Sequence, residues 1–188
     1  MPAQNSAQVR VGATGKLYVA PLGTAAPADA NVAWPSGWVE VGLTTDDGVN
    51  VNPSLARKDL NAWQSLYPVR TIITSRGIEM AFKLIQKAGT NLQLVFGGGS
   101  ITNLGGAPVS YKYVPPAASF IDERAFGLEV NDGSITDRFL FYRGLITDIG
   151  NIIFRHDDDV KFELKATMLL PASGDFFNII SNDPAMAS

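Results

Sequence analysis

Carboxylates and a histidine gather at one point of this sequence, where they could bind a metal ion. His156 is followed directly by Asp157, Asp158 and Asp159, and carboxylate oxygens are ligands that hard divalent cations prefer. The spacing differs from that of an EF-hand loop, however, and Asp is a common turn residue. We therefore interpret this stretch as a solvated hairpin turn and expect no bound metal.

Two further groups could support catalysis, and neither has the pattern that its chemistry needs. The run from Gly97 to Ser100 is glycine-rich like a phosphate-binding loop, but no Lys-Ser or Lys-Thr pair follows it, and the expected helix precedes it. Asp122, Glu123 and Glu129 could act as paired acids in glycoside hydrolysis, although no rule of sequence spacing supports this. A helix end with a flexible link, and a solvated turn beside a strand edge, are the better interpretations.

The residue types exclude several other kinds of site. A single histidine rules out a multi-histidine metal centre, and the absence of cysteine rules out thiolate ligands, disulfides and a cysteine nucleophile. No serine lies in a Gly-x-Ser-x-Gly elbow. The sequence therefore predicts no enzyme activity and no cofactor.

Length and charge set the remaining bounds. The 188 residues suit a single domain over residues 1–188 that can bury a core. A net charge of −3 disfavours tight binding of nucleic acid through neutralised phosphates. The first residues lack the basic and apolar stretches of a signal peptide, and no apolar run reaches the roughly twenty residues that span a bilayer. We expect a soluble protein, made in the cytoplasm, with no membrane partner.

The elements that would position these side chains are mainly strands. Alternating apolar residues indicate strands near Val39 to Leu43, Val69 to Gln86 and Val160 to Leu170, and Asn131-Asp132-Gly133 indicates a hairpin turn. A further strand is expected from Val109 to Val114, after a flexible link that contains Gly97 to Gly99 and Gly105-Gly106. One short helix is expected between Thr90 and Phe96. The pattern predicts a mainly β fold: an antiparallel β-sandwich or half-open barrel with one short flanking helix, a long inter-strand loop and extended terminal arms. The arms would be residues 1–10 and 171–188.

The long loop is the most unusual feature of the expected fold. It would run from Thr44 to Asn61, whereas hairpin loops usually need two to five residues and loops beyond about twelve are commonly functional. It mixes both charge signs with apolar side chains: Asp46, Asp47, Val49, Val51, Leu55, Arg57, Lys58 and Asp59. Such a loop is expected to contact something outside its own domain.

Aromatic residues leave two interpretations open. Trp38, Trp63 and Tyr67 could belong to the core, as strand aromatics usually do, or could anchor a contact with a neighbouring subunit. The apolar pairs Phe176-Phe177 and Ile179-Ile180 lie beyond the last expected strand. They must either fold back on their own domain or dock on another chain.

Several short segments, in order, resemble a known family. They are Thr14 to Thr24, Trp38 to Gly42, Trp63 to Arg70, Thr74 to Gly77, and the helix that ends in Phe96 to Gly99. Together they resemble the major tail tube proteins of long-tailed, non-contractile bacteriophages of the siphophage type, most closely those of phages that infect actinobacteria. The resemblance covers roughly Val11 to Met168, and the closing strands fit by general character only.

The resemblance implies a structural virion protein that acts without catalysis. Members of the family form hexameric rings that stack into a tube, and the tape-measure protein and then DNA pass through its lumen without specific binding. The loop at 44–61 would reach an adjacent ring, and the terminal arms would help to join rings. Tail tip and tail terminator proteins would be further partners. Trp63, Tyr67, Phe176 and Phe177 are the candidates for subunit interfaces.

A lumen that lets DNA slide should offer no strong phosphate clamp. Acidic and small polar side chains are therefore expected to face inward, with Glu40, Ser75 and Glu79 as candidates. The dimensions are compatible with this function: six subunits that each give four strands ~4.8 Å apart and tilted ~40° would form a barrel ~48 Å across. Side chains would leave room for a DNA duplex.

Two other functions remain open at this point. A ring protein of a secretion-system tube would share the fold. A monomeric β-sandwich that binds carbohydrate would instead need exposed aromatic residues arranged as a flat or concave platform.

Overall fold

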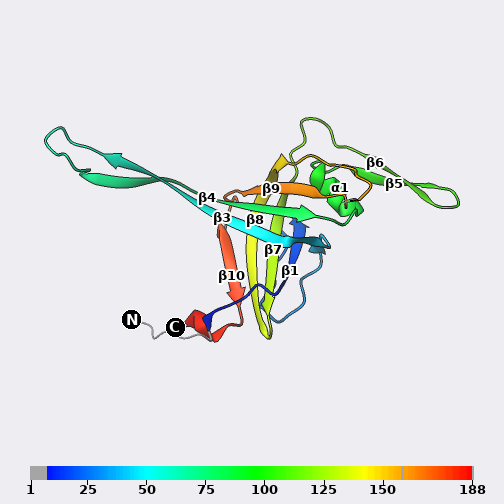
Figure 1. The fold of residues 1–188 in the computed structure, drawn as a ribbon, viewed down its shortest axis with the longest axis horizontal. Coiled ribbons are helices and arrows are strands. Elements are labelled where there is room, and N and C mark those ends of the chain that lie inside the picture. The colour runs from blue at the N-terminus through cyan, green and yellow to red at the C-terminus, as the bar shows by residue number, and fades with distance from the viewer. Residues whose placement is uncertain (1–7, 158, 188) are drawn as a thin grey trace.

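The computed structural model describes residues 8–157 and 159–187. Its fold is mainly antiparallel β-structure with one short α-helix, as the sequence predicts (Figure 1). The strands are β1 (Thr14–Pro21), β2 (Val39–Glu40), β3 (Thr44–Leu60), β4 (Arg70–Leu84), β5 (Ser100–Gly105), β6 (Ser110–Val114), β7 (Glu123–Asp132), β8 (Ile135–Ile149), β9 (Phe162–Met168) and β10 (Phe177–Ser181). The helix α1 spans Gly89–Val95, and a 3-10 turn, η2, spans Pro184–Ala187.

One hydrogen-bonded sheet runs through the body in the order β2-β1-β7-β8-β9-β4-β3. It bends at β8, because the first part of this strand pairs with β10 from Asp137 to Phe141, while its last part pairs with β9 from Gly144 to Ile149. The bend places β3, β4 and β9 across β1, β7 and β8, so that the sheet forms two layers (Figure 1). The body is therefore a sandwich made by one folded sheet.

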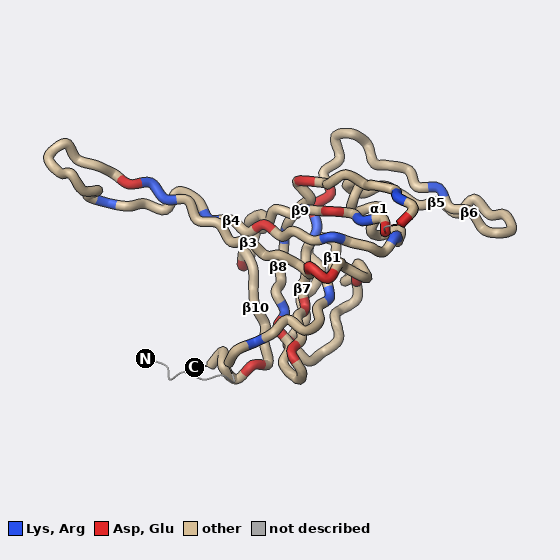
Figure 2. Tube along the Cα trace, viewed as in Figure 1, with Lys and Arg blue, Asp and Glu red and all other residues tan. Residues whose placement is uncertain are grey.

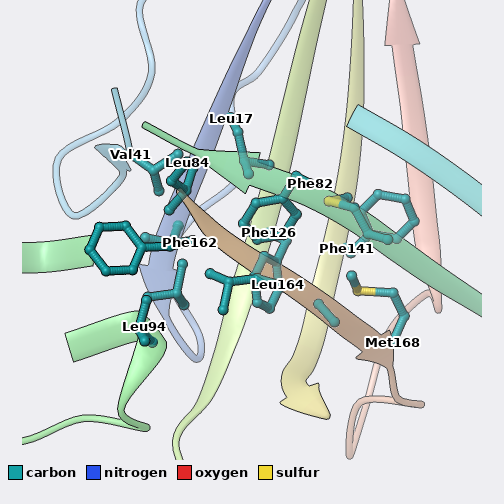
Figure 3. Close-up of a cluster of buried hydrophobic side chains, with 14 of the residues drawn as sticks. Leu17, Val41, Phe82, Leu84, Leu94, Phe126, Phe141, Phe162, Leu164 and Met168 are labelled. Atoms are coloured by element: carbon teal, nitrogen blue, oxygen red, sulfur yellow. The ribbon is translucent and has the colours of Figure 1, made fainter. Parts of the chain in front are cut away.

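The main core fills the space between the layers. In the second half of β4 and along β9 every second residue is buried: Ile78, Met80, Phe82, Leu84, Phe162, Leu164, Ala166 and Met168. Figure 3 shows Phe82, Phe162 and Leu164 close to Leu17, Phe126 and Phe141 of the other layer. This is the alternation that a strand with one buried face produces, and it confirms the prediction of the two strands.

A second, smaller cluster covers the opposite face of β1 and β7. It contains Tyr18, Ala20, Trp38, Ala125 and Leu140, with Trp34 packed against it. Trp34 and Trp38 come from the irregular segment 22–38, which lies over this face. We call this segment the strap. Trp38 is 9% exposed, so the core interpretation is correct for this tryptophan.

The prediction of a long loop at 44–61 is wrong, because this segment is a strand. Thr44–Leu60 is strand β3, 17 residues long, which pairs with β4 along most of its length. Pro53 lies within this strand, which is possible because β3 is an edge strand and a proline, which lacks an N–H, is tolerated where that position faces solvent. The true connection is the short tip from 61 to 69.

The C-terminal segment folds back on its own domain. Strand β10 pairs with β8, and the Phe177 ring stacks on Phe141 with their centroids 6.0 Å apart. Phe176 packs against the main core. Half of the expected arm at 171–188 is thus sheet or 3-10 turn. Arg10 ties the N-terminal segment to it through a 2.6 Å bond to Asp183. Residues 1–7 of the other expected arm lie outside the described residues.

Candidate assembly surfaces

A long β-hairpin projects from the body. Its two strands are β3 beyond Asn52 and β4 before Ile78, and we call residues 53–77 the arm. The strands stay paired from Pro53, opposite Ile78, to Leu60, opposite Arg70. Figure 1 shows the arm extending away from both layers, with no other labelled element beside it. Nearly all its side chains are exposed, which explains why the sequence there lacks the alternation of a half-buried strand.

The arm leaves the body at the point where β4 no longer has side chains buried in the core. From Ile78 to Leu84, β4 contributes alternate side chains to the core, whereas Arg70 to Arg76 have no second layer to pack against. A bulge between Ala56 and Arg57 interrupts the register. Bulges increase the local twist and redirect a hairpin. The arm is a regular strand pair held only by its own ladder.

The tip of the arm is built by its own hydrogen bonds. The Val69 amide donates to the Leu60 carbonyl at 2.9 Å, and the Ser65 hydroxyl both accepts from the Tyr67 amide at 3.1 Å and donates to the Tyr67 carbonyl at 2.9 Å. The backbone groups that these bonds join are therefore satisfied within the tip itself. They leave the large side chains of the tip pointing outward.

Three apolar side chains of the tip are almost completely exposed. Trp63 is 99% exposed, Leu66 101% and Tyr67 80%. Scattered apolar residues on a surface are ordinary, but large adjacent ones indicate a contact surface. For Trp63 and Tyr67 the core interpretation is therefore wrong, and their role at a subunit interface stays a prediction.

The residues predicted for inter-ring contact separate into two groups. Leu55, Arg57, Lys58 and Asp59 lie on the arm. Asp46, Asp47, Val49 and Val51 lie at its base. There, Val49 and Val51 pack against the subunit's own core, and the Asp47 carboxylate lies 3.2 Å from the Lys83 ammonium. Only the first group lies on the projecting arm.

The lumen candidates do not share one face of the sandwich. Glu79 points away from the main core between Ile78 and Met80, on the outer face of the layer that contains β3, β4 and β9. Ser75 follows the same parity out along the arm. Glu40 pairs with Tyr18 in the register of β1 and β2, so it lies on the outer face of the opposite layer, 3.4 Å from Lys16.

Phe176 and Phe177 contribute to the subunit itself. Both belong to the apolar packing around β8 and β10, although Phe177 is still 39% exposed. The sequence left folding back and docking equally open, and the structure shows folding back. Any interface role of these two rings is limited to their exposed edges.

A second hairpin, β5–β6, is only half predicted by the sequence. It protrudes on the side of the body opposite the arm (Figure 1). The Tyr113 hydroxyl donates to the Gly98 carbonyl at 2.7 Å and anchors it beside α1. Leu104 and Tyr111 are exposed. The sequence indicated β6 alone, because Gly97 to Gly99 and Gly105-Gly106 on either side of β5 suggested a flexible link; the apolar Ile101 and Leu104 were the available signal.

The carboxylates considered for catalysis are each held by an arginine. Arg124 Nε lies 2.8 Å from Asp122, and Arg143 donates to both oxygens of Glu123 at 2.9 and 2.7 Å. This pairing lowers the pKa of Glu123 below its ordinary value. These carboxylates are thus engaged in structural ion pairs rather than gathered as an acid pair.

Neither a metal-binding cluster nor a membrane-spanning helix occurs in the described part of the chain. No three His, Asp or Glu side chains converge there as a metal would require. Among the same residues, no helix has the length and apolar character needed to cross a bilayer.

A family model described as phage tail tube protein matches residues 2–188. The chain belongs to the phage tail tube protein family. It is accordingly a structural component of the virion tail and not an enzyme. The match supports the tail tube function over the secretion-system ring protein and the carbohydrate-binding module that the sequence left open.

Similarity to individual known proteins adds little to this assignment. No curated protein matches the chain. The chain is similar to one from a solved structure titled "Virion of native gene transfer agent (GTA) particle", at 12% identity and a TM-score of 0.43, over 96% of this chain and 100% of the other.

Proposed function

We propose that this tail tube protein assembles as hexameric rings that stack axially, and that the arm provides the contact between rings. The observation that carries this proposal is the fully exposed apolar tip on a hairpin that stands clear of the body of its own subunit. Burying a side chain of this size stabilises a contact by about 1.5–3 kcal/mol. Three of them at one tip supply enough free energy to hold a neighbouring ring once repeated around the tube.

Ring closure would use the open edges of the sheet. Strand β3 ends the sheet at one side, and β1 is only partly covered at the other, because β2 pairs with Tyr18 and Val19 alone. Two different edges that meet head to tail generate a closed ring when the rotation between copies is suitable. Such pairing also removes the aggregation hazard of a long free edge.

The outer face of β3, β4 and β9 is our proposal for the lumen wall. Glu79 and Ser75 lie on this side, together with Asn52, Ala81 and Thr167, which are small or polar. Lys83 on the same face is flanked by Asp47 and Glu163, at 3.2 and 3.4 Å. A cation that is already paired attracts phosphate weakly. Lys165, opposite Ala81 on the same face, is exposed and forms no ion pair among the described residues, so the proposed wall would offer DNA a single unpaired lysine at this level rather than a phosphate clamp. Glu40 lies on the other layer and does not fit this wall.

Electron microscopy of the purified, concentrated chain tests the proposal. We expect rings with sixfold symmetry and tubes of stacked rings, with a lumen wide enough for a duplex. The tape-measure, tail tip and tail terminator proteins are proposed as further partners, and co-expression with each would show whether it changes tube length or initiation. A species that stays strictly monomeric at every concentration and in the presence of a tail tip would contradict the proposal.

A further inference from the structure

The arm and the rest of the chain carry opposite charges. The arm holds four of the fifteen Lys and Arg residues, namely Arg57, Lys58, Arg70 and Arg76, but only one of the eighteen Asp and Glu residues, Asp59. It therefore carries +3, while the rest of the chain carries −6 and the whole chain −3. Figure 2 shows these basic positions along the arm, apart from the mixed charges of the body.

The cations of the arm also differ from most cations of the body in their partners. Seven of the eleven basic residues of the body form ion pairs, namely Arg10, Lys16, Lys83, Arg124, Arg138, Arg143 and Lys161. The other four, Lys87, Lys112, Arg155 and Lys165, form none among the described residues. Within the described residues, none of the four arm cations forms an ion pair. Asp59, the carboxylate beside them, accepts a 2.6 Å hydrogen bond from the Thr71 hydroxyl instead.

The unpaired cations lie on both faces of the arm. Arg57 and Lys58 are consecutive on β3, opposite Ile73 and Ile72, so their side chains leave the hairpin in opposite directions. Both faces thus combine a basic side chain with an apolar one. A partner must therefore offer carboxylates and apolar surface together.

We propose that the arm docks on a second copy of this chain through ion pairs between its four cations and carboxylates of that copy's body. This rests on the proposed function and specifies how the arm recognises its neighbour. The body of the chain is the complementary partner because it has six more acidic than basic residues. Among the described residues, four exposed carboxylates of the body form neither an ion pair nor a side-chain hydrogen bond and are available for this contact: Asp46, Asp148, Asp157 and Asp175.

Two alternative roles for the arm cations predict different behaviour. Lysine and arginine on an edge strand can act only to prevent unwanted pairing, and in that case their removal would increase self-association. A polyanion such as DNA could bind the same cations, but phosphates would leave Trp63, Leu66 and Tyr67 uncovered. Assembly measured in low and high salt, with charge-reversed variants and with DNA, separates the three roles.

The first experiment measures self-association of the full chain in 50 mM and 500 mM NaCl, by sedimentation and electron microscopy. Salt screens exposed charges, with a Debye length of about 10 Å at 0.1 M and 3 Å at 1 M. We expect the concentration needed for tube formation to rise by about tenfold or more in high salt. A threshold that stays the same or falls in high salt would overturn the proposal.

The double variant Arg57→Glu, Lys58→Glu makes the test residue-specific. Its matched control is Lys87→Glu, Arg155→Glu, which changes the net charge equally at exposed body cations that have no ion pair among the described residues. We expect the arm variant to raise the threshold at least tenfold at 50 mM NaCl while the control changes it less than about threefold. Equal effects, or easier assembly of the arm variant, would refute the proposal.

A short DNA duplex serves as the competing ligand, with binding followed by fluorescence anisotropy. Saturable binding that the arm variant loses, while its assembly stays normal, would assign the cations to DNA and overturn the proposal. The outcome is also separable from that of the proposed function. Wild-type protein that never forms rings or tubes defeats the function, whereas wild type and arm variant that assemble alike defeat only the ionic docking.

Discussion

Arg138 and Glu129 form a buried ion pair on the face of the sheet that the strap covers. The Nε of Arg138 donates to Glu129 Oε2 at 2.9 Å, the indole N–H of Trp34 donates to the same oxygen at 2.8 Å, and Arg138 Nη1 reaches the Asp29 carbonyl at 2.8 Å. The guanidinium also lies 5.1 Å from the centroid of the Trp34 ring. This one pair therefore connects β7 and β8 to the strap.

Replacing Arg138 by alanine should be strongly destabilising. Arg138 is only 5% exposed, and removing one partner of a buried pair leaves the other charge uncompensated, at a cost of about 3 kcal/mol or more. Urea unfolding monitored by tryptophan fluorescence measures the change. Arg155→Ala, at an exposed arginine, is the control and should shift the free energy of unfolding by less than about 0.5 kcal/mol. Similar values for the two variants would show that the pair contributes little.

Gly127→Ala tests how closely the strap approaches the sheet. A Cβ at Gly127 would lie 2.5 Å from Cη2 of Trp34 and 3.0 Å from Cζ3 of Trp38, so the strap would have to move. Forcing an extra methyl group into packed surroundings costs about 1–3 kcal/mol. Gly12→Ala is the matched control, because its Cβ would lie at an ordinary 3.4 Å from Val130. Thermal unfolding followed by near-UV circular dichroism should separate them, and equal melting temperatures would contradict the close packing.

The tip can be tested without disturbing the fold. Changing Trp63, Leu66 and Tyr67 to serine should leave the melting temperature unchanged, since these side chains are 80–101% exposed. Assembly should require a concentration at least about a hundredfold higher, because the apolar contact is lost. Electron microscopy and light scattering give the readout. The control Asn61→Ala, Gln64→Ala alters polar residues of the same tip and should assemble normally; normal tubes from the serine variant would exclude the tip as a contact.

The link between the two ends of the chain should weaken in acid. The bond to Arg10, together with the Ala185 amide, lowers the pKa of Asp183 from its ordinary 3.8. A lowered carboxyl pKa gives stability that is present above the unfolded-state pKa and is lost as the pH falls through the folded-state value. The difference in melting temperature between wild type and Asp183→Asn should therefore be constant near pH 7 and shrink below about pH 4. A difference that does not change with pH would exclude this contribution.

Patterns of burial decide which parts of the fold the sequence predicts well. Strands β4 and β9 were predicted because Met80 to Leu84 and Phe162 to Met168 have one face in the core and one in water. Strand β3 was missed because beyond Asn52 both its faces are exposed, so no alternation marks it. Hydrogen bonding to β4 holds it as a strand, and that pairing has no signature in the residues of β3 themselves.

The sequence could predict only in part which of the candidate interface residues are exposed. Trp38 and Trp63 are the same residue type, yet one lies under the strap and the other at the end of a hairpin. Their surroundings depend on pairings that sequence spacing does not reveal. The Arg138–Glu129 pair and Trp34, 95 residues from Glu129, were likewise beyond the reach of local patterns.

The continuity of the sheet has a mechanical consequence. From the tip of the arm, the chain runs without a break through β4, and the ladders continue through β9 into β8, which belongs to both layers. A pulling force on the tip is therefore transmitted along the covalent backbone of β4. It loads the hydrogen bonds between β4, β9 and β8 in shear, so many of them would have to break at the same time. If the tail curves, the bending would then occur at the contacts between rings, while each subunit keeps its shape.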